Sequence, residues 1–145
     1  MTEKLPLTRR SLPIALIRAR EGILSPIREM LAETGITEQQ WRVLRVLAEN
    51  GEMGTKTLAQ QSSLLLPSLT RIATAMVNKG LITQTRDTTD RRRQMIDITP
   101  QGLKIIEDRM EQTAEIIAGF RTTLGDENYE TLLDLLAKLD PKMRD

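Results

Sequence analysis

The sequence predicts a mainly α-helical fold with one small β-hairpin. Apolar residues recur three and four positions apart over most of the 145 residues, which is the spacing of amphipathic helices. Two short helical segments are separated by a turn at residues 63–66, and two alternating segments, 81–86 and 95–99, flank a polar tip. Together these observations are typical of a winged helix-turn-helix with further helices before and after it.

The first predicted helix covers residues 12–32. Its apolar positions recur at helical spacing, and Thr34-Gly35 is a typical stop. Pro26 lies inside this helix and leaves the carbonyl group of Gly22 without its helical partner, so a kink or notch is expected there. The apolar stripe consists of Leu16, Ile23, Leu24, Ile27 and Leu31.

Polar residues on the same helix are candidates for binding a small anion. Arg20 falls on the apolar stripe, where its guanidinium group needs an anionic or carbonyl partner. Ser11, Arg18 and Ser25 lie seven residues apart and form a second, polar line. Alternatively, Arg20 forms a salt bridge with Glu21 or with an acid on another helix, or extends its charged end to solvent.

A helix-turn-helix is predicted in residues 37–80. Thr37 and Gln40 form a capping box that opens a helix ending at Asn50-Gly51. A shorter helix at residues 55–62 buries Leu58 and Ala59. Pro67 is suited to the first position of the next helix, which stops at Gly80. The apolar face expected for the opening helix consists of Trp41, Leu44, Leu47 and Ala48.

The helix after the turn has an outer face suited to a DNA major groove. Its inward stripe is Leu69, Ile72, Ala73 and Met76, which leaves outward Ser68, Arg71, Thr74, Ala75 and Asn78, with Thr70 on the flank. Short side chains allow the backbone to approach base edges in a groove roughly 12 Å wide, and Arg or Asn can read those edges. The alternative is a face that is merely solvated.

Positive charge is concentrated between residues 53 and 93. The whole chain has a net charge of only +1, but this segment has seven Lys or Arg residues and two Asp residues, a net charge of +5. Taken alone, a basic hairpin tip is usually a solvated loop. After a helix-turn-helix it can act as a wing whose arginines enter a minor groove. We expect Asp90 to orient the guanidinium group of Arg92 by a charge-assisted hydrogen bond.

The composition argues against several other classes of protein. With 39% hydrophobic and 28% charged residues the chain is an ordinary globular protein. It has no cysteine and no histidine, which excludes disulfides, thiol chemistry and the common transition-metal sites. We see no glycine-rich phosphate loop and no marked pair of carboxylates, so we expect no enzyme, no cofactor and no metal. The absence of cysteine, secretory signal and membrane span predicts the cytoplasm.

The C-terminal region predicts an association between helices. Apolar spacings of three and four residues continue through one long helix, and Asp126 is expected to cap a last helix. More apolar surface is present than one contact would bury, so a second copy of the chain is the simplest partner. An intramolecular antiparallel pair is the alternative. The seam is Leu103, Ile106, Met110, Thr113, Ile117, Phe120 and Leu124, and the last helix carries Tyr129, Leu132, Leu133, Leu135, Leu136 and Leu139.

On these residues the chain resembles the MarR family of winged-helix transcription regulators. The resemblance is carried by the helix pair, by Asp90-Arg91-Arg92 and by Thr99-Pro100-Gln101-Gly102, and covers nearly the whole chain. Ser11-Leu12-Pro13, residues 18–21 and residues 66–71 further resemble the subfamily that represses homoprotocatechuate degradation. The chain lacks the cysteine of the family's peroxide sensors.

The resemblance implies a homodimer that binds double-stranded DNA as a repressor and contacts no membrane. It divides the chain into an N-terminal dimerisation and ligand-pocket helix at 1–35, a DNA-binding region at 36–100 and C-terminal dimerisation helices at 101–145, within a single domain. The candidate DNA-binding residues are Lys56, Pro67, Ser68, Thr70, Arg71, Thr74, Asn78, Arg86, Asp90, Arg91, Arg92 and Arg93.

The resemblance also implies a small aromatic acid as effector, such as 4-hydroxyphenylacetate or 3,4-dihydroxyphenylacetate, and control of aromatic-compound catabolism. The candidate ligand-binding residues are Ser11, Arg18, Arg20, Ser25 and Trp41, although Trp41 also fits a core position. Alternatives are a regulator of another aromatic-acid or efflux operon, and a winged-helix protein-interaction module without an operator. A single-stranded RNA binder needs exposed stacking aromatics, whereas Trp41, Phe120 and Tyr129 lie on apolar stripes.

Overall fold

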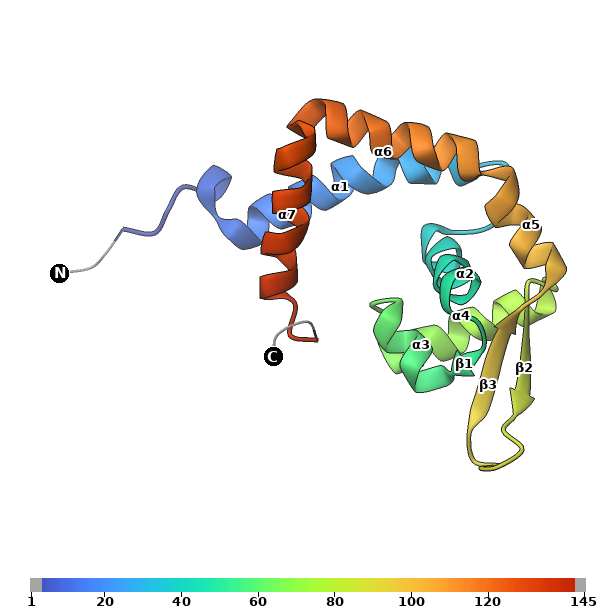
Figure 1. Cartoon of the computed structure of the whole chain (residues 1–145). Helices are drawn as coiled ribbons and strands as arrows, with labels where there is room; N and C mark the ends of the chain where they lie inside the picture. Colours follow the sequence, from blue (N-terminus) through green and yellow to red (C-terminus); the bar gives the residue numbers. More distant parts are fainter. Residues whose placement is uncertain (1–3, 143–145) are drawn as a thin grey trace. The chain divides into compact units, whose positions relative to one another are not determined.

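The computed structural model describes residues 4–142, and these divide into two compact units between Arg109 and Met110. The first unit contains a short 3₁₀ helix η1 (Thr8–Arg10), α1 (Leu12–Leu31), α2 (Glu38–Asn50), β1 (Met53–Gly54), α3 (Thr55–Gln61), α4 (Leu66–Asn78), β2 (Ile82–Arg86), β3 (Gln94–Ile98) and α5 (Pro100–Asp108) (Figure 1). The second unit contains α6 (Met110–Leu124) and α7 (Asp126–Leu139). The predicted class, mainly α with a small wing, is therefore confirmed.

Helix α2 is the centre of the first unit and contacts α1, α3, α4, α5 and β3. It begins with the predicted capping box, in which Thr37 Oγ1 accepts from the Gln40 amide at 3.1 Å and Gln40 Oε1 accepts from the Thr37 amide at 3.1 Å. Trp41, Leu44 and Leu47 are buried in the core as expected. Ala48 is exposed, so its assignment to the buried face was wrong: that face is completed by Val43.

The wing is a three-stranded antiparallel sheet in the order β1-β3-β2. β2 pairs with β3 from Ile82 opposite Ile98 to Arg86 opposite Gln94, close to the two predicted strands. β1 was not predicted, because two residues are too few to show an alternating pattern. This strand connects α2 to α3 and pairs with the middle of β3, so it joins the wing to the helix-turn-helix.

The wing ends in a cap that leads into α5. Thr99 Oγ1 accepts from the Gly102 amide at 3.1 Å and donates to the Gly80 carbonyl oxygen at 2.7 Å. A Cβ atom at Gly102 would overlap the carbonyl oxygen of Leu81, so only glycine fits here. The segment Thr99-Pro100-Gln101-Gly102 therefore holds α5 close to the base of the wing.

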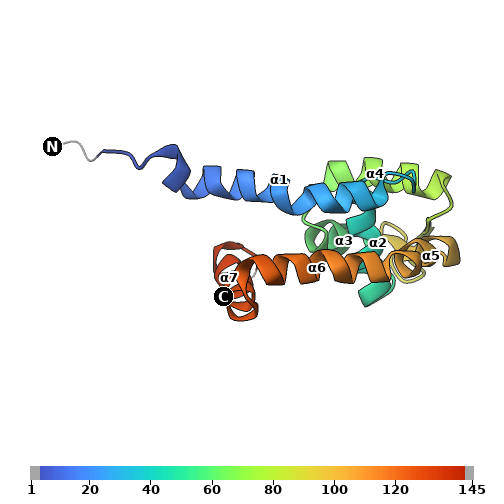
Figure 2. The ribbon, with the colours of Figure 1, turned by 90° about the horizontal axis from the view of Figure 1, so that it is seen from above.

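Helix α1 is continuous through Pro26 (Figure 2), so the predicted kink does not interrupt it. Only Leu31 of this helix is buried, where it packs into the core. Arg20 is exposed, so the expected desolvation of its guanidinium group is absent from the single chain. The carboxylate of Glu21 accepts from Arg28 at 2.9 Å, and this hydrogen bond, more than the charge of Arg20, lowers the pKa of Glu21.

Two predictions about the C-terminal helices were wrong. The long helix is divided at Arg109, whose amide donates to the Ile106 carbonyl oxygen three residues back, which tightens the last turn of α5. Asp126 is the first residue of α7 rather than its cap, because Gly125 with φ +86° occupies the cap position. Arg121 links α6 to α7 through Asp126 at 3.4 Å and Glu130 at 2.6 Å, and its guanidinium carbon lies 4.3 Å from the centre of the Tyr129 ring.

Candidate nucleic-acid interface

Helix α4 presents the predicted outer face. It begins one residue earlier than expected, at Leu66, so Pro67 occupies its second position, where a missing amide also costs no helical hydrogen bond. The inward residues Leu69, Ile72, Ala73 and Met76 are buried in the core. On the outer face Pro67, Thr70, Arg71, Thr74 and Asn78 are exposed and Ser68 is half-buried.

The two threonines of this face have a defined hydrogen-bonding capacity. Thr70 Oγ1 donates to the Leu66 carbonyl oxygen at 3.0 Å, and Thr74 Oγ1 donates to the Thr70 carbonyl oxygen at 3.0 Å. Because each hydroxyl proton is used within the helix, the oxygen atoms remain available as acceptors. A base edge facing these oxygen atoms would offer an amino group, as adenine and cytosine do, whereas a thymine methyl group would pack against the threonine methyl groups.

We expect Arg71→Ala to relax the sequence preference at one operator position. Arg71 is the exposed cation of α4, and a guanidinium group that pairs with a base edge contributes about 1 to 3 kcal/mol of discrimination. The measurement is the affinity for operator duplexes carrying each base at each position. Equal losses on operator and random DNA would contradict base reading by Arg71.

Arg42 positions the turn that precedes α4, and sequence reasoning missed it. Its guanidinium group donates to both carboxylate oxygens of Glu38, at 3.2 and 2.7 Å, and to the carbonyl oxygens of Ser62 and Ser63, at 2.9 and 3.3 Å. Ser63 has φ +53°, the left-handed region that non-glycine residues rarely adopt. The four-residue spacing of Glu38 and Arg42 indicates a helical ion pair, but nothing in the sequence indicates that Arg42 also contacts the turn.

Lys79 also has a structural partner. Its Nζ atom donates to the Gly35 carbonyl oxygen at 2.7 Å and to Gln40 Oε1 at 3.3 Å. Although Lys79 adds to the charge of the basic segment, its ammonium group ties the end of α4 to the start of α2.

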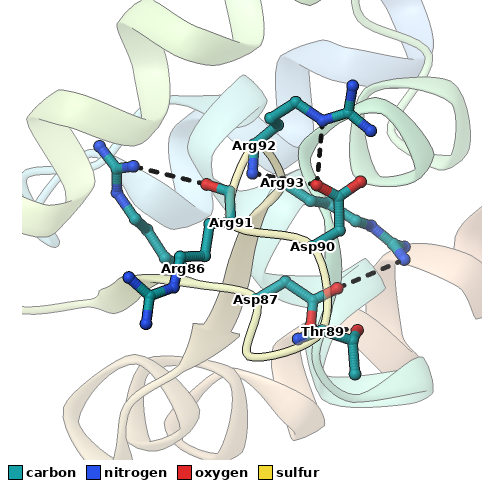
Figure 3. Close-up of polar contacts among 7 residues, drawn as sticks. All are labelled: Arg86, Asp87, Thr89, Asp90, Arg91, Arg92 and Arg93. Carbon is teal, nitrogen blue, oxygen red and sulfur yellow. Dashed lines mark hydrogen bonds and ion pairs between the residues drawn. The ribbon is translucent and has the colours of Figure 1, made fainter.

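The wing tip has the expected contact between Asp90 and Arg92 (Figure 3). Asp90 Oδ1 accepts from the Arg92 amide at 3.1 Å and from Arg92 Nε at 3.2 Å, which confirms this predicted pair. The Arg92 side chain is 92% exposed, so its orientation is set by Asp90 and not by packing. Arg86 Nη1 donates to the Arg91 carbonyl oxygen at 3.5 Å and supports the other side of the loop.

A second acid, Asp87, organises the start of the same loop. Its Oδ1 atom accepts from the Thr89 amide at 3.1 Å and from the Thr89 hydroxyl at 3.0 Å. These hydrogen bonds, and less strongly the charge of Arg93, lower the pKa of Asp87 below its usual 3.8. Because the pKa of Asp87 is lower in the folded chain than in the unfolded chain, its ionisation stabilises the fold at pH values above the unfolded-state pKa. This stabilisation is lost as the pH falls through the pKa of the folded state. The contribution of the ionised Asp87 is therefore present at neutral pH.

Four of the candidate DNA-binding residues line an open cavity of about 300 Å³ between α3, α4 and the base of the wing. Lys56 of α3, Thr70 of α4 and Arg92 and Arg93 of the wing contribute to its lining. The structure thus brings together residues that are up to 37 positions apart in the sequence, from Lys56 to Arg93. Three positive charges of the basic segment, those of Lys56, Arg92 and Arg93, therefore meet at this cavity.

The predicted ligand residues lie on α1 and α2. Arg18, Arg20 and Ser25 are exposed and Ser11 is half-buried at the start of α1. Trp41 is only 5% exposed and is part of the hydrophobic core, which favours its core assignment over a ligand contact.

Residues 4–142 form neither a membrane-spanning helix nor a cluster of acidic metal ligands. None of the helices there combines the length and apolar character that crossing a bilayer requires. The same residues contain no group of three or more Asp or Glu side chains arranged to hold a metal ion.

The helix-turn-helix, the three-stranded wing and the basic face define a winged helix-turn-helix protein. Residues 36–93 match the model of the MarR family. The chain is 40% identical over 129 residues to the HTH-type transcriptional regulator FarR of Neisseria gonorrhoeae, covering 89% of this chain and 88% of that protein. It is 35% identical over 126 residues to the homoprotocatechuate degradative operon repressor of Escherichia coli, covering 87% and 85%.

A solved structure agrees with these relationships. The crystal structure of NadR in complex with 4-hydroxyphenylacetate has a TM-score of 0.81 and 37% sequence identity, and the match covers 96% of this chain and 97% of that chain. The chain therefore belongs to the MarR family of transcriptional regulators. The resemblance deduced from the wing and the helix pair is confirmed.

Proposed function

We propose that the protein is a dimeric repressor that binds a palindromic operator and is released by a small aromatic carboxylate. The dimer would block a promoter by occupying it. The observation that carries this proposal is the face on which α4 presents small polar groups beside a basic wing. Since such a regulator acts on the chromosome, its place of action would be the cytoplasm.

The DNA-binding part of the proposal is supported by the two elements of this face. α4 has the exposed groups that suit a major groove, and Arg92 at the wing tip suits the adjacent minor groove. In a two-fold dimer the recognition helices would face successive major grooves roughly 34 Å apart, which requires a palindrome.

Dimerisation is supported by apolar side chains that the single chain leaves exposed. On α1, Leu12 is 54% and Ile17 is 65% exposed, and on α7, Leu135 and Leu139 are both 51% exposed. Isolated exposed apolar residues are normal, but rows of them on two helices indicate a partner. A second copy of the chain would cover both helices.

The effector class is supported by two relatives. One is named a homoprotocatechuate degradative operon repressor, and another was solved with 4-hydroxyphenylacetate. In this chain Arg18 or Arg20 would pair with the carboxylate, between α1 and the DNA-binding region. To release DNA, the ligand must bind more tightly to a dimer whose two recognition helices have a spacing that the operator cannot accept. A ligand with equal affinity for both spacings would not change their populations.

The proposal is tested by fluorescence anisotropy with operator and random duplexes, with and without a panel of phenylacetates, benzoates and cinnamates. We expect operator preference, a steep fall of affinity with salt and release by 4-hydroxyphenylacetate or 3,4-dihydroxyphenylacetate. Release only by other compounds would favour a different aromatic-acid or efflux operon. Affinity that does not depend on salt would favour a protein-interaction module.

We expect Arg20→Ala to raise the concentration of 4-hydroxyphenylacetate needed for half-maximal release without changing operator affinity. The reason is that a charge-assisted hydrogen bond to a carboxylate contributes about 1.5 to 3 kcal/mol, or roughly 10- to 150-fold in concentration. Arg18→Ala is measured beside it as the alternative partner, because it removes the same charge from the same helix; the variant with the larger increase identifies the arginine that pairs with the carboxylate. If 4-hydroxyphenylacetate releases Arg20→Ala at the same concentration as the unaltered protein, Arg20 has only a structural role.

A further inference from the structure

Arg93 differs from its neighbour Arg92 in where its guanidinium group lies. In Figure 3 the two groups lie apart, Arg92 beside Asp90 and Arg93 beside Asp87, with Nη1 of Arg93 3.9 Å from Asp87 Oδ2. Arg92 is 92% exposed, whereas the Arg93 side chain is 52% exposed and folds back toward the base of the wing. Arg93 therefore belongs to the cavity more than to the tip.

Gly54 provides the space that Arg93 occupies. A Cβ atom at Gly54 would lie 2.8 Å from Arg93 Nε and 2.9 Å from Nη2, closer than real Cβ atoms approach other atoms. The backbone of Gly54 is ordinary, with φ −70° and ψ 158°, so no turn requires glycine here. A side chain at this position would displace the guanidinium group of Arg93, which packs against Gly54.

The cavity beside this contact has the chemistry of an anion site. Lys56, Arg92 and Arg93 bring three positive charges, and its lining contains no Asp or Glu. Its remaining lining residues are Gly54, Thr55, Thr57, Leu66, Thr70 and Gln94. The Thr55 hydroxyl donates to the Gln94 carbonyl oxygen at 3.4 Å, which connects the start of α3 to the wing.

The position of the cavity identifies the anion. If α4 enters a major groove and the wing enters the adjacent minor groove, one DNA strand must pass between them, because the sugar-phosphate backbone separates the two grooves. The cavity lies between α4 and the wing, on the path of that strand. This step rests on the proposed operator binding.

We propose that Arg93, held against Gly54, and Lys56 together bind a backbone phosphate of the DNA strand that separates the two grooves. Gly54 is then a positioning residue for Arg93. The contact carries no base information, so it contributes equally on every sequence. In a dimer it occurs twice, once in each half-site.

The test is the salt dependence of DNA affinity, measured by anisotropy with operator and random duplexes. Complete loss of one phosphate contact flattens the plot of log affinity against log salt by about 0.9, so Arg93→Gln, which leaves Lys56 on the same phosphate, should flatten it by up to about 1.8 for a dimer. We expect the same flattening on both duplexes, and a similar one for Lys56→Gln. Arg45→Gln, which removes a charge from an exposed residue of α2 outside the cavity lining, should leave the slope unchanged.

Gly54→Ala is the sharpest variant because it changes no charge. It should displace the Arg93 guanidinium group and reduce the salt dependence of DNA affinity as Arg93→Gln does. The double variant of Gly54→Ala and Arg93→Gln should show the same salt dependence as Arg93→Gln alone. Circular dichroism should show an intact fold, since the new methyl group meets the end of a flexible side chain. If Gly54→Ala does not fold, Arg93→Gln and Lys56→Gln decide the question against Arg45→Gln.

Two failures are distinguishable. If the unaltered protein shows neither operator preference nor a steep salt dependence, the proposed function itself is wrong. If it shows both, but Gly54→Ala or Arg93→Gln keeps the original slope, only the phosphate contact is overturned. Flattening by Arg45→Gln as large as that by Arg93→Gln would also overturn it, because the effect would then be one of net charge.

Discussion

Arg92→Ala should weaken binding to operator and random DNA alike, by about 1 to 3 kcal/mol for each wing and about 2 to 6 kcal/mol for a dimer. The Arg92 side chain is 92% exposed, and Asp90 Oδ1 accepts from its Nε atom at 3.2 Å and from the Arg92 backbone amide at 3.1 Å. It is thus oriented before DNA arrives, so little side-chain entropy is lost on binding. A narrow minor groove attracts such a guanidinium group electrostatically.

Arg91→Ala is the matched control for this prediction. It removes the same charge from the next residue, whose side chain is also exposed. Anisotropy titrations at one fixed salt concentration should show a smaller loss for Arg91→Ala than for Arg92→Ala. Asp90→Asn, which weakens the orienting contact but keeps Arg92, should fall between them. Unchanged affinity of Arg92→Ala would remove the wing from the interface.

Elements set by local interactions could be predicted from the sequence. The capping box of Thr37 and Gln40, the left-handed Gly80 after α4 and the Asp90–Arg92 contact each involve residues within a few positions. The inward stripe of α4 followed from helical spacing alone. Because these signals are local, the residue pattern was sufficient to predict both α4 and the wing tip.

Contacts between distant residues could not be predicted in this way. The Arg42 contact with Ser62 spans 20 positions, and the packing of Arg93 on Gly54 spans 39. The division at Arg109 was also missed, because an unbroken apolar seam does not reveal where the backbone tightens. The contacts of Arg42 and Arg93 position the turn before α4 and shape the cavity, so the sequence alone predicted candidate residues but not their arrangement.

Ile17→Asp should convert the dimer to a monomer and reduce operator affinity by about 10²- to 10⁴-fold. Ile17 is 65% exposed in the single chain, so a charge there costs the isolated fold little. In a dimer interface the same carboxylate would be buried without a partner. A monomer would then bind one half-site and lose the gain that comes from linking two binding modules.

Ala15→Asp is the matched control, because position 15 lies roughly on the opposite side of α1 and is also exposed. Analytical ultracentrifugation should show a monomer for Ile17→Asp and a dimer for Ala15→Asp, with circular dichroism confirming that both are folded. Binding of Ile17→Asp to a single half-site should match that of the unaltered protein, because α4 and the wing are unchanged. A dimer that persists in Ile17→Asp would exclude this face of α1 from the interface, whereas a monomeric unaltered protein would favour the intramolecular helix pair.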